Sequence, residues 1–471
     1  MKHRHHAKPD HHLASRSLRH SQHDGMAYAV MTGAGETYLS AFALLLHAST
    51  WQIGLLTALP PLIGSFAQVL SAWLGQIIKT RKVIIVKGAL LQALSWLPLF
   101  ALPMLFPDHS IAILILCVTV YHALGNLVIP QWSSMMGDLV RENQRGRYFS
   151  RRNRITSMIN FIALLGAGLL LNYFQLHDRS LYGFIAIFLV AFAARLVSVW
   201  FINKMYDPPG HVATLELPGR RELWRRIRHS GFLRFSVFVA MMNLAVGIAS
   251  PYFTVYMLRD LQLSYLQFTV LTATSILAQF LTLNSWGRLS DAFGNRFILL
   301  VSGCVVPLLP AAWTLSTNFW YLLLVQVVAG FFWAGFSLCT ANFLFDLVPP
   351  EKRITYMAAH NVFAAVGVFL GAVLGGVTAY FAGSIRAAPV LPDLDYALYY
   401  VFLFSTLLRL LVFIVFIRHI REVRVTRLPT AHGVVLRATR SPVLAGLVFE
   451  LGGGRKAAVP VPEPAPRTAK D

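Results

Sequence analysis

The residue with the clearest capacity for chemistry in this 471-residue sequence is Glu36, a carboxylate near the middle of a long apolar run, within the segment GAGETY. A charge in membrane hydrocarbon costs at least about 2.5–3.5 kcal/mol on insertion scales, so such residues are rare and often functional. Glu36 could carry a proton or balance the charge of a solute. Alternatively, it could be a hydrogen-bonded carboxyl that ties one helix to its neighbour. Gly33 and Gly35 would let a helix or a ligand approach closely.

Other polar side chains in apolar runs are candidates to bind a proton or a solute. His122 and Asn126 are four residues apart, so they share one face of a helix. His122 is the next titratable candidate after Glu36. The remaining candidates are Asn243, Gln279, Gln326 and Trp333. Their alternative role is hydrogen bonding between helices, which is common for Asn and Gln in membranes.

No pattern in the sequence predicts a resident cofactor or a metal ion. Cys117, Cys304 and Cys339 lie inside apolar runs without paired spacing, which indicates packing residues. A G-x-x-x-x-G-K-[ST] loop does not occur, which argues against ATP as an energy source. We find no catalytic cluster of histidines or carboxylates, so we do not expect an enzyme.

The composition predicts a membrane protein. Hydrophobic residues make up 56% of the chain and charged residues only 13%, about half the charged fraction of a soluble domain. A soluble fold would need a charged surface, so the outer surface must contact a lipid bilayer. The net charge of +21 would suit a nucleic-acid binder. However, Lys and Arg cluster between apolar runs, as in cytoplasmic loops, so we expect no nucleic acid.

Twelve apolar runs are long enough for transmembrane helices, which need about 20 residues each. They lie at 26–47, 52–77, 83–105, 110–130, 155–175, 181–203, 232–257, 264–287, 296–316, 318–345, 354–382 and 398–419. The expected fold class is therefore an all-α membrane protein of about 12 transmembrane helices. An N-terminal six-helix half covers residues 26–203, and a C-terminal half covers residues 232–420.

Three segments flank or join these halves. Residues 1–25 form a His-rich basic tail, predicted to be disordered and close to anionic lipid. Residues 204–231 are a linker with an amphipathic segment, and residues 421–471 are a second disordered tail. Lys and Arg are frequent in one set of alternate loops, whereas the other set has only Arg179, Arg259 and Arg386. This asymmetry predicts that both termini are cytoplasmic.

The two halves repeat each other. Residues 138–153 read DLVRENQRGRYFSRRN and residues 346–361 read DLVPPEKRITYMAAHN, so Asp, Arg, Tyr and Asn recur at matching positions. Arg195 and Arg409 recur in the sixth and twelfth spans. We interpret them as structural, with long side chains that can extend to the inner surface. Internal repeats of this kind are a feature of many transporters.

The loop after the eighth span reads GRLSDAFGNR. Gly287 and Gly294 permit close helix approach and a tight turn, whereas Asp291 and Arg296 supply a hydrogen-bond acceptor and a charged partner. With the six-plus-six spans and the repeat, this motif resembles that of the major facilitator superfamily, over about residues 26–420.

The resemblance implies two six-helix halves, with spans one, four, seven and ten lining a transport pathway. It also implies inner-gate charge networks in which Asp138 and Asp346 act with Arg145 and Arg353, alongside the GRLSDAFGNR motif. The first-half copy of that motif, residues 75–82, lacks the acidic residue. This departure argues against an inner charge pair at the first-half loop.

Together these observations predict a monomeric secondary active transporter in the cell (inner or plasma) membrane. We expect it to move a small organic solute by alternating access, with protons as the coupling ion. The alternatives are a facilitator, or a sensor or lipid-handling protein on the same fold, and, less favoured, a membrane-embedded enzyme.

Overall fold

Long apolar stretches fold as helices because a backbone in hydrocarbon must satisfy its N–H and C=O groups within the segment. The computed structural model describes residues 11–78, 80–141, 144–208, 231–348, 353–386 and 394–418. Every regular element in these residues is a helix. Eleven helical segments in this part of the chain are long and apolar enough to cross a membrane. Together with α1, which is polar over its opening turns, these segments confirm the predicted fold class of an all-α membrane protein with about 12 transmembrane helices.

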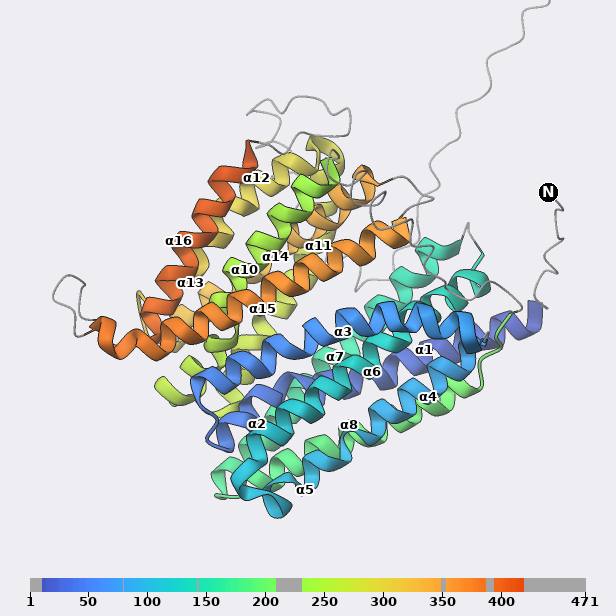
Figure 1. Cartoon of the computed structure of the whole chain (residues 1–471), viewed down its shortest axis with the longest axis horizontal. Coiled ribbons are helices and arrows are strands. Elements are labelled where there is room, and N and C mark those ends of the chain that lie inside the picture. The colour runs from blue at the N-terminus through green and yellow to red at the C-terminus, as the bar shows by residue number, and fades with distance from the viewer. Residues whose placement is uncertain are drawn as a thin grey trace, which may run out of the picture.

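The helices of the first half are grouped together, and so are those of the second half (Figure 1). The first half comprises α1 (His11–Ala34), η1 (Glu36–Tyr38), α2 (Leu39–Leu45), α3 (Thr50–Ile78), α4 (Arg81–Leu94), α5 (Leu97–Leu105), η2 (Pro107–His109), α6 (Ser110–Leu139), α7 (Arg145–Leu176) and α8 (Ser180–Asn203). The second half comprises α10 (Gly231–Val255), η4 (Tyr256–Asp260), α11 (Tyr265–Phe293), α12 (Asn295–Val305), η5 (Val306–Leu308), α13 (Leu309–Ala312), α14 (Phe319–Leu347), α15 (Arg353–Arg386) and α16 (Leu398–Ile417).

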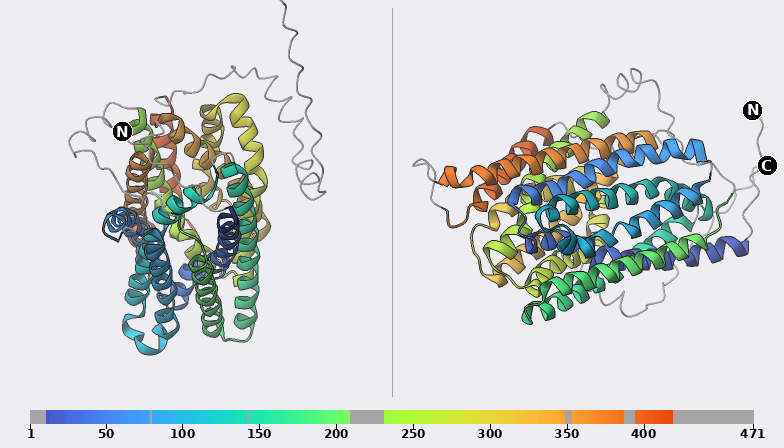
Figure 2. Two further views of the ribbon diagram at one scale, coloured as in Figure 1. Left: turned by 90° about the vertical axis from the view of Figure 1, so that its right-hand side faces the viewer. Right: turned by 60° about the horizontal axis from the view of Figure 1, so that its bottom comes forward.

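The predicted disorder of residues 1–25 is wrong for residues 11–25, which form the first turns of α1. These turns are polar, but they pack against α7 and α8, and Ser17 and Ser21 are buried there. Figure 2 shows the start of α1 reaching beyond the other first-half helices. Residues 1–10, the amphipathic part of the linker and the tail 421–471 lie outside the described residues.

Besides the first span, which runs from α1 through η1 into α2, two of the predicted spans are interrupted helices. The third span consists of α4 and α5, separated by Ser95 and Trp96. The ninth consists of α12, η5 and α13, where Pro307 and Pro310 fall in the run. Proline removes a backbone N–H and clashes with the preceding turn, which favours an interruption here, although the prolines of α3, α6 and α10 lie inside continuous helices.

The sequence repeat is also a repeat of side-chain contacts. Tyr38 donates a hydrogen bond to the carbonyl of Leu164 at 2.7 Å, and Tyr252 donates one to the carbonyl of Ala372 at 3.0 Å. The two tyrosines occupy matching places in their halves, before α3 and before α11. The starts of those two helices are matched as well, each with a serine bonded to a glutamine three residues later: Ser49 with Gln52, and Ser264 with Gln267.

The hydrophobic core joins the halves at one end only. One large cluster of buried side chains combines both halves and includes Tyr38, Phe184, Tyr256 and Phe402. Towards the other end the described residues form two separate clusters, one from the first half and one from the second. The end with the shared core is the one that carries α2, α5 and the loops before α3 and α11 (Figure 1). We call it the joined end, and the opposite end, where α1 begins, the divided end.

Hydrogen bonds between the halves also lie at the joined end. The hydroxyl groups of Tyr38 and Thr269 are 2.8 Å apart. The backbone N–H of Tyr265 donates to Gln175 Oε1 at 3.0 Å, and Arg259 donates to Thr50 Oγ1 at 2.9 Å. The most extensive helix contacts across the interface are those of α3 with α15 and of α7 with α11, and α10 also contacts α2 and α3.

A glycine run on α15 lets that helix approach α10 closely. A Cβ atom placed at Gly367, Gly371 or Gly375 would collide with backbone carbonyl groups of α10. This run therefore serves close packing between the two helices.

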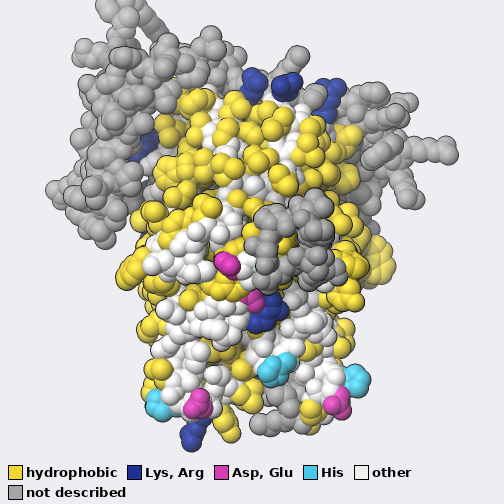
Figure 3. All heavy atoms as spheres, turned by 90° about the vertical axis from the view of Figure 1, so that its left-hand side faces the viewer, with side chains coloured by type: hydrophobic (Ala, Val, Ile, Leu, Met, Phe, Trp, Pro, Cys, Tyr) yellow, Lys and Arg dark blue, Asp and Glu magenta, His cyan; other side chains and the backbone are white. Residues whose placement is uncertain are grey.

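The surface of the bundle is suited to lipid. Large hydrophobic side chains are exposed on the outside of many helices, including Phe66, Trp73, Leu169, Tyr380 and Leu407. Figure 3 shows a face on which hydrophobic side chains predominate and charged ones are few.

Candidate functional site

Glu36 lies at a break in the first membrane crossing. Helix α1 ends at Ala34, and Glu36 begins the short 3-10 turn η1 that leads into α2. Its side chain is 33% exposed. Tyr121 on α6 donates a hydrogen bond to Glu36 Oε2 at 2.9 Å, and His122 Nε2 lies 3.8 Å from Glu36 Oε1. A carboxylate, a phenol and an imidazole therefore meet between the first and fourth crossings.

The two glycines before Glu36 serve helix packing. A Cβ atom on Gly33 would collide with the carbonyl oxygen of Asn160 on α7, and one on Gly35 would lie 2.7 Å from side-chain atoms of Ala191 and Trp96. These glycines let α7 and α8 approach α1, so protein side chains and backbone occupy the space that a ligand could have used.

Polar contacts continue from His122 to a third helix. Asn126 Nδ2 donates to the carbonyl of His122 at 2.9 Å, one turn along α6. Gln68 on α3 donates to Asn126 Oδ1 at 2.7 Å. His122 and Asn126 share one face of α6, as their spacing suggested, and the structure adds contacts of His122 with Glu36 and of Asn126 with Gln68 that the spacing did not predict.

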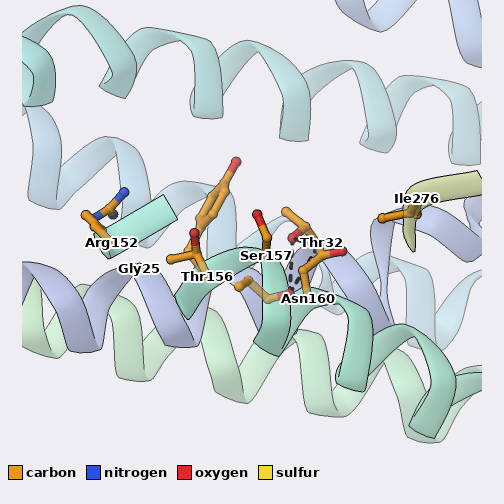
Figure 4. A pocket seen from close by; sticks show the side chains of 9 residues that line it. Gly25, Thr32, Arg152, Thr156, Ser157, Asn160 and Ile276 are labelled. Atoms are coloured by element: carbon orange, nitrogen blue, oxygen red, sulfur yellow. Dashed lines mark hydrogen bonds between the residues drawn. The ribbon is translucent and has the colours of Figure 1, made fainter. Parts of the chain in front are cut away.

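A cavity of about 320 Å³ lies beside this cluster along α1, towards the divided end. Its lining comes from α1, α7 and one residue of α11: Gly25, Tyr28, Ala29, Thr32, Arg152, Thr156, Ser157, Asn160 and Ile276. Figure 4 shows Thr32 and Asn160 facing each other, with a hydrogen bond of 2.7 Å from Asn160 Nδ2 to Thr32 Oγ1. The hydroxyl and amide groups of Thr32, Thr156, Ser157 and Asn160 lie among apolar surface in this cavity, and residues of both halves border it.

A buried ionic network closes the α1 side of the cavity. The Asp24 side chain is 5% exposed; its Oδ1 accepts a hydrogen bond of 2.7 Å from Ser198, and its Oδ2 lies 3.5 Å from Arg152 Nη2. Arg195 donates to the same Ser198 hydroxyl at 2.8 Å, and its guanidinium lies 4.9 Å from the ring centre of Tyr28. Asp24 thus stands between two arginines from α7 and α8.

Arg195 and Arg409 are both only 3% exposed, so the prediction that they extend to the surface is wrong. Arg195 belongs to the Asp24 network. Arg409 donates to the backbone carbonyls of Val306 and Val246 at 3.3 and 3.5 Å. The repeated arginine therefore faces an acidic network in the first half and helix backbone in the second.

An inner charge cluster is present at the divided end of the first half. Arg81 is buried, with Nη1 2.5 Å from Asp138 Oδ2 and Nη2 2.9 Å from Asp207 Oδ1. It also donates to the carbonyl of Pro208 at 2.7 Å. The expectation that the first-half loop lacks an inner charge pair is wrong. Arg81 forms ion pairs with Asp138 on α6 and with Asp207 on the segment after α8.

The corresponding loop of the second half has different contacts. Gly294 has φ 85°, a conformation that favours glycine, and joins α11 to α12. Asn295 Nδ2 donates to Asp346 Oδ2 at 3.0 Å. Asp291 is exposed and Arg296 half-buried. Gly287 faces α14, with Leu338 the nearest side chain.

Arg145 and Arg353 are the first residues of α7 and α15. Their side chains lie outside the described part of the structure. Their predicted contacts with Asp138 and Asp346 therefore stay predictions.

The second-half candidates do not join the Glu36 cluster. Asn243, Gln279, Gln326 and Trp333 are all half-buried. Trp333 packs edge-on against Phe336 on its own helix. The three amides make no side-chain hydrogen bond within the described ranges, and their role in binding a solute stays a prediction.

Sequence reasoning missed Asp24, Tyr28 and the residues that α7 contributes to the cavity. One signal was present: Asp24, Tyr28 and Thr32 recur every four residues, which places them on one helix face. The pattern was overlooked because the predicted first span began at residue 26, which left Asp24 outside the helix. No local pattern marks Arg152 or Asn160, because their roles depend on α7 lying against α1.

The sequence profile described as the Major Facilitator Superfamily matches residues 25–245 and 233–454 of this chain. A vacuolar membrane amino acid uptake transporter of Schizosaccharomyces pombe is 32% identical over 97 residues. That match covers 21% of this chain and only 16% of the relative.

Two solved structures show the same fold at low sequence identity. A bacterial homologue of the iron transporter ferroportin, in an inward-facing state, superimposes with a TM-score of 0.63 at 14% identity, covering 86% of this chain and 98% of that one. A D-xylose–proton symporter superimposes with a TM-score of 0.64 at 12% identity, covering 88% and 99%.

Proposed function

This chain belongs to the Major Facilitator Superfamily, and we propose that it is a proton-coupled secondary transporter that moves a small organic solute by alternating access. Membership of this family makes it a multi-pass membrane transport protein rather than an enzyme. The coupling ion, the solute and the monomeric state are the parts that we add as proposals.

The observation that carries proton coupling is the contact of Glu36 with Tyr121 and His122. Glu36 is one-third exposed, so it can exchange protons with a water-filled pathway. Tyr121 donates a hydrogen bond to Glu36 Oε2, so the carboxylate already has a polar partner on α6. The adjacent His122 is a second group in this site that can bind and release a proton. Protonation of Glu36 would remove this local charge and so weaken its contact with His122. The hydrogen bonds from His122 through Asn126 to Gln68 would rearrange in response.

The fold supports alternating access with the divided end open. Shared core packing and hydrogen bonds hold the halves together at the joined end, whereas the clusters at the divided end are separate. The basic loops lie at the divided end, so we place it in the cytoplasm together with both termini. In this arrangement the cavity beside α1 and α7 faces inward.

The orientation can be tested with reporter fusions. Fusions after residues 108 and 317 are expected to behave as external, and fusions near residues 80 and 215 as internal. Alkaline phosphatase and green fluorescent protein fusions give opposite signals on the two sides. An external signal at residue 215 would reject the arrangement of two six-helix halves with cytoplasmic termini.

The exposed carboxylate of Asp291 is proposed to act as an inner latch on the loop between α11 and α12. Asp291→Asn is expected to slow turnover about fivefold, which corresponds to the loss of one contact of about 1 kcal/mol. Membrane insertion should stay normal because the group is exposed. Initial rates in proteoliposomes give the comparison, with Asp108→Asn, at an exposed site of the joined end, as the matched control. Equal initial transport rates for Asp291→Asn and wild type would reject a role for Asp291 in gating.

The solute can be found by a thermal-shift screen of the purified protein against a library of small organic solutes. A hit is then tested for counterflow in proteoliposomes. Counterflow is expected for a carrier. Binding without counterflow would reject transport and favour a sensor on the same fold.

A further inference from the structure

The first turns of α1 carry a stripe of basic side chains. His12, Arg16, Arg19 and His23 are spaced by four, three and four residues and are all exposed. This spacing places them on one face of a helix. We call this face, with the half-buried His20 beside it, the α1 basic stripe.

The opposite face holds the stripe rigidly. Ser17 and Ser21 are buried at 2% and 0% exposure. The Ser17 hydroxyl accepts a hydrogen bond of 2.9 Å from the backbone N–H of Tyr206, and the Ser21 carbonyl accepts one of 3.2 Å from Arg152. The stripe is therefore presented by a helix that is fixed to α7 and to the segment after α8.

The end of α8 completes a cluster of cations with the stripe. His23 stacks on Phe201 with ring centres 4.9 Å apart, and Lys204 Nζ lies 3.3 Å from the ring centre of Trp200. Burial lowers the pKa of His20, and the charges of Arg16, Lys204 and His23 lower it further. Cationic groups of two helices therefore converge on one surface.

The three permanent cations of this surface have no acidic partner in the part of the chain that the structure describes. Arg16, Arg19 and Lys204 form no ion pair with any carboxylate in the described ranges. The nearest acid along α1 is Asp24, which is buried and engaged by Ser198 and Arg152. The surface thus has an unmatched positive charge that an anion would balance.

The position of the cluster favours a lipid anion. Trp200 is 54% exposed at the last turns of an apolar crossing helix, and tryptophans at such positions lie at the level of lipid headgroups. The α1 turns that bear the stripe extend beyond the neighbouring helices at the same end (Figure 2). Cations at this level attract anionic headgroups, at about fivefold in affinity for each Lys or Arg.

We propose that Arg16, Arg19 and Lys204 bind the phosphate of an anionic phospholipid in the leaflet at the divided end, with Trp200 packing against the upper part of its acyl chains. His20 and His23 border the same site. The bound lipid would link the start of α1 to the end of α8, the two helices that hold Asp24 and Arg195.

Native mass spectrometry of the purified protein in detergent, titrated with phosphatidylglycerol, tests the proposal. Wild type should retain phosphatidylglycerol in preference to phosphatidylcholine. The triple variant Arg16→Ala, Arg19→Ala, Lys204→Ala should bind it about a hundredfold more weakly. The matched control is Arg234→Ala, Arg288→Ala, Arg418→Ala, which removes the same charge from exposed positions at the same end of the second half.

The control variant should retain affinity close to that of wild type. An equal loss in both variants would overturn the proposal in favour of a general charge effect. Displacement of the lipid by millimolar inorganic phosphate would also overturn it, because the site would then bind a free anion. Equal melting temperatures for both variants, in the absence of lipid, would confirm that the difference comes from binding.

Discussion

Replacing Glu36 by glutamine is expected to abolish solute accumulation driven by a pH gradient while leaving exchange between equal solute pools intact. Glutamine keeps the size of the side chain and can still accept the hydrogen bond from Tyr121, but it cannot titrate. A gradient of one pH unit supports up to about tenfold accumulation per proton. Wild type should approach that ratio, whereas the variant should stay near equal concentrations inside and outside. Uptake into proteoliposomes with imposed gradients gives the measurement.

Asp108→Asn is a suitable control for the loss of a carboxylate, because Asp108 is exposed between α5 and α6. Loss of both accumulation and exchange in Glu36→Gln would instead assign Glu36 a direct contact with the solute. Full accumulation in the variant would reject Glu36 as the coupling group. His122→Gln would then be the next variant to examine, since His122 shares the site.

Replacing Asp24 by asparagine is expected to destabilise the protein by about 3–5 kcal/mol, the usual cost of removing one partner from a buried ionic network. Arg195 would remain 3% exposed and would lose the nearby negative charge. Asparagine can still accept the hydrogen bond from Ser198, so the loss of stability would arise from the lost negative charge and not from a lost hydrogen bond. Thermal unfolding of the purified protein measures the change.

The double variant Asp24→Asn, Arg195→Gln should recover much of the lost stability, because it removes the unpaired cation along with its partner. Asp178→Asn is the matched control: Asp178 is exposed in the loop after α7, so its change should stay within about 0.5 kcal/mol. A double variant less stable than Asp24→Asn alone would contradict the assignment of Arg195 to this network.

The sequence predicted the fold because the determining signals are local. Apolar length specifies each crossing, and the repeated segments 138–153 and 346–361 indicate two halves of one architecture. The Ser-x-x-Gln starts of α3 and α11 show how matching residues give matching helix ends. The start of α1 was misjudged because its helicity depends on packing of Ser17 and Ser21 against other helices, which composition does not reveal.

The candidate site was predicted only in part, for a related physical reason. Glu36 stood out because a carboxylate in an apolar run is costly, and His122 and Asn126 followed from their spacing on one helix. Asp24 lay outside the predicted span, and Arg152 and Asn160 join the site only because Gly33 lets α7 approach α1. Likewise, Arg81 meets Asp138 and Asp207 from distant parts of the chain. Such contacts depend on tertiary packing that no local pattern encodes.

The central claim is that solute movement through this protein is coupled to protons, and solute-dependent proton flux in proteoliposomes tests it most directly. Wild-type protein is reconstituted with a pH-sensitive dye inside the vesicles, and a solute identified by thermal shift is added outside without an imposed pH gradient. We predict a change in internal pH that requires both the protein and the solute and disappears when a protonophore is present. Counterflow of the same solute without any change in internal pH would contradict the account and identify a facilitator.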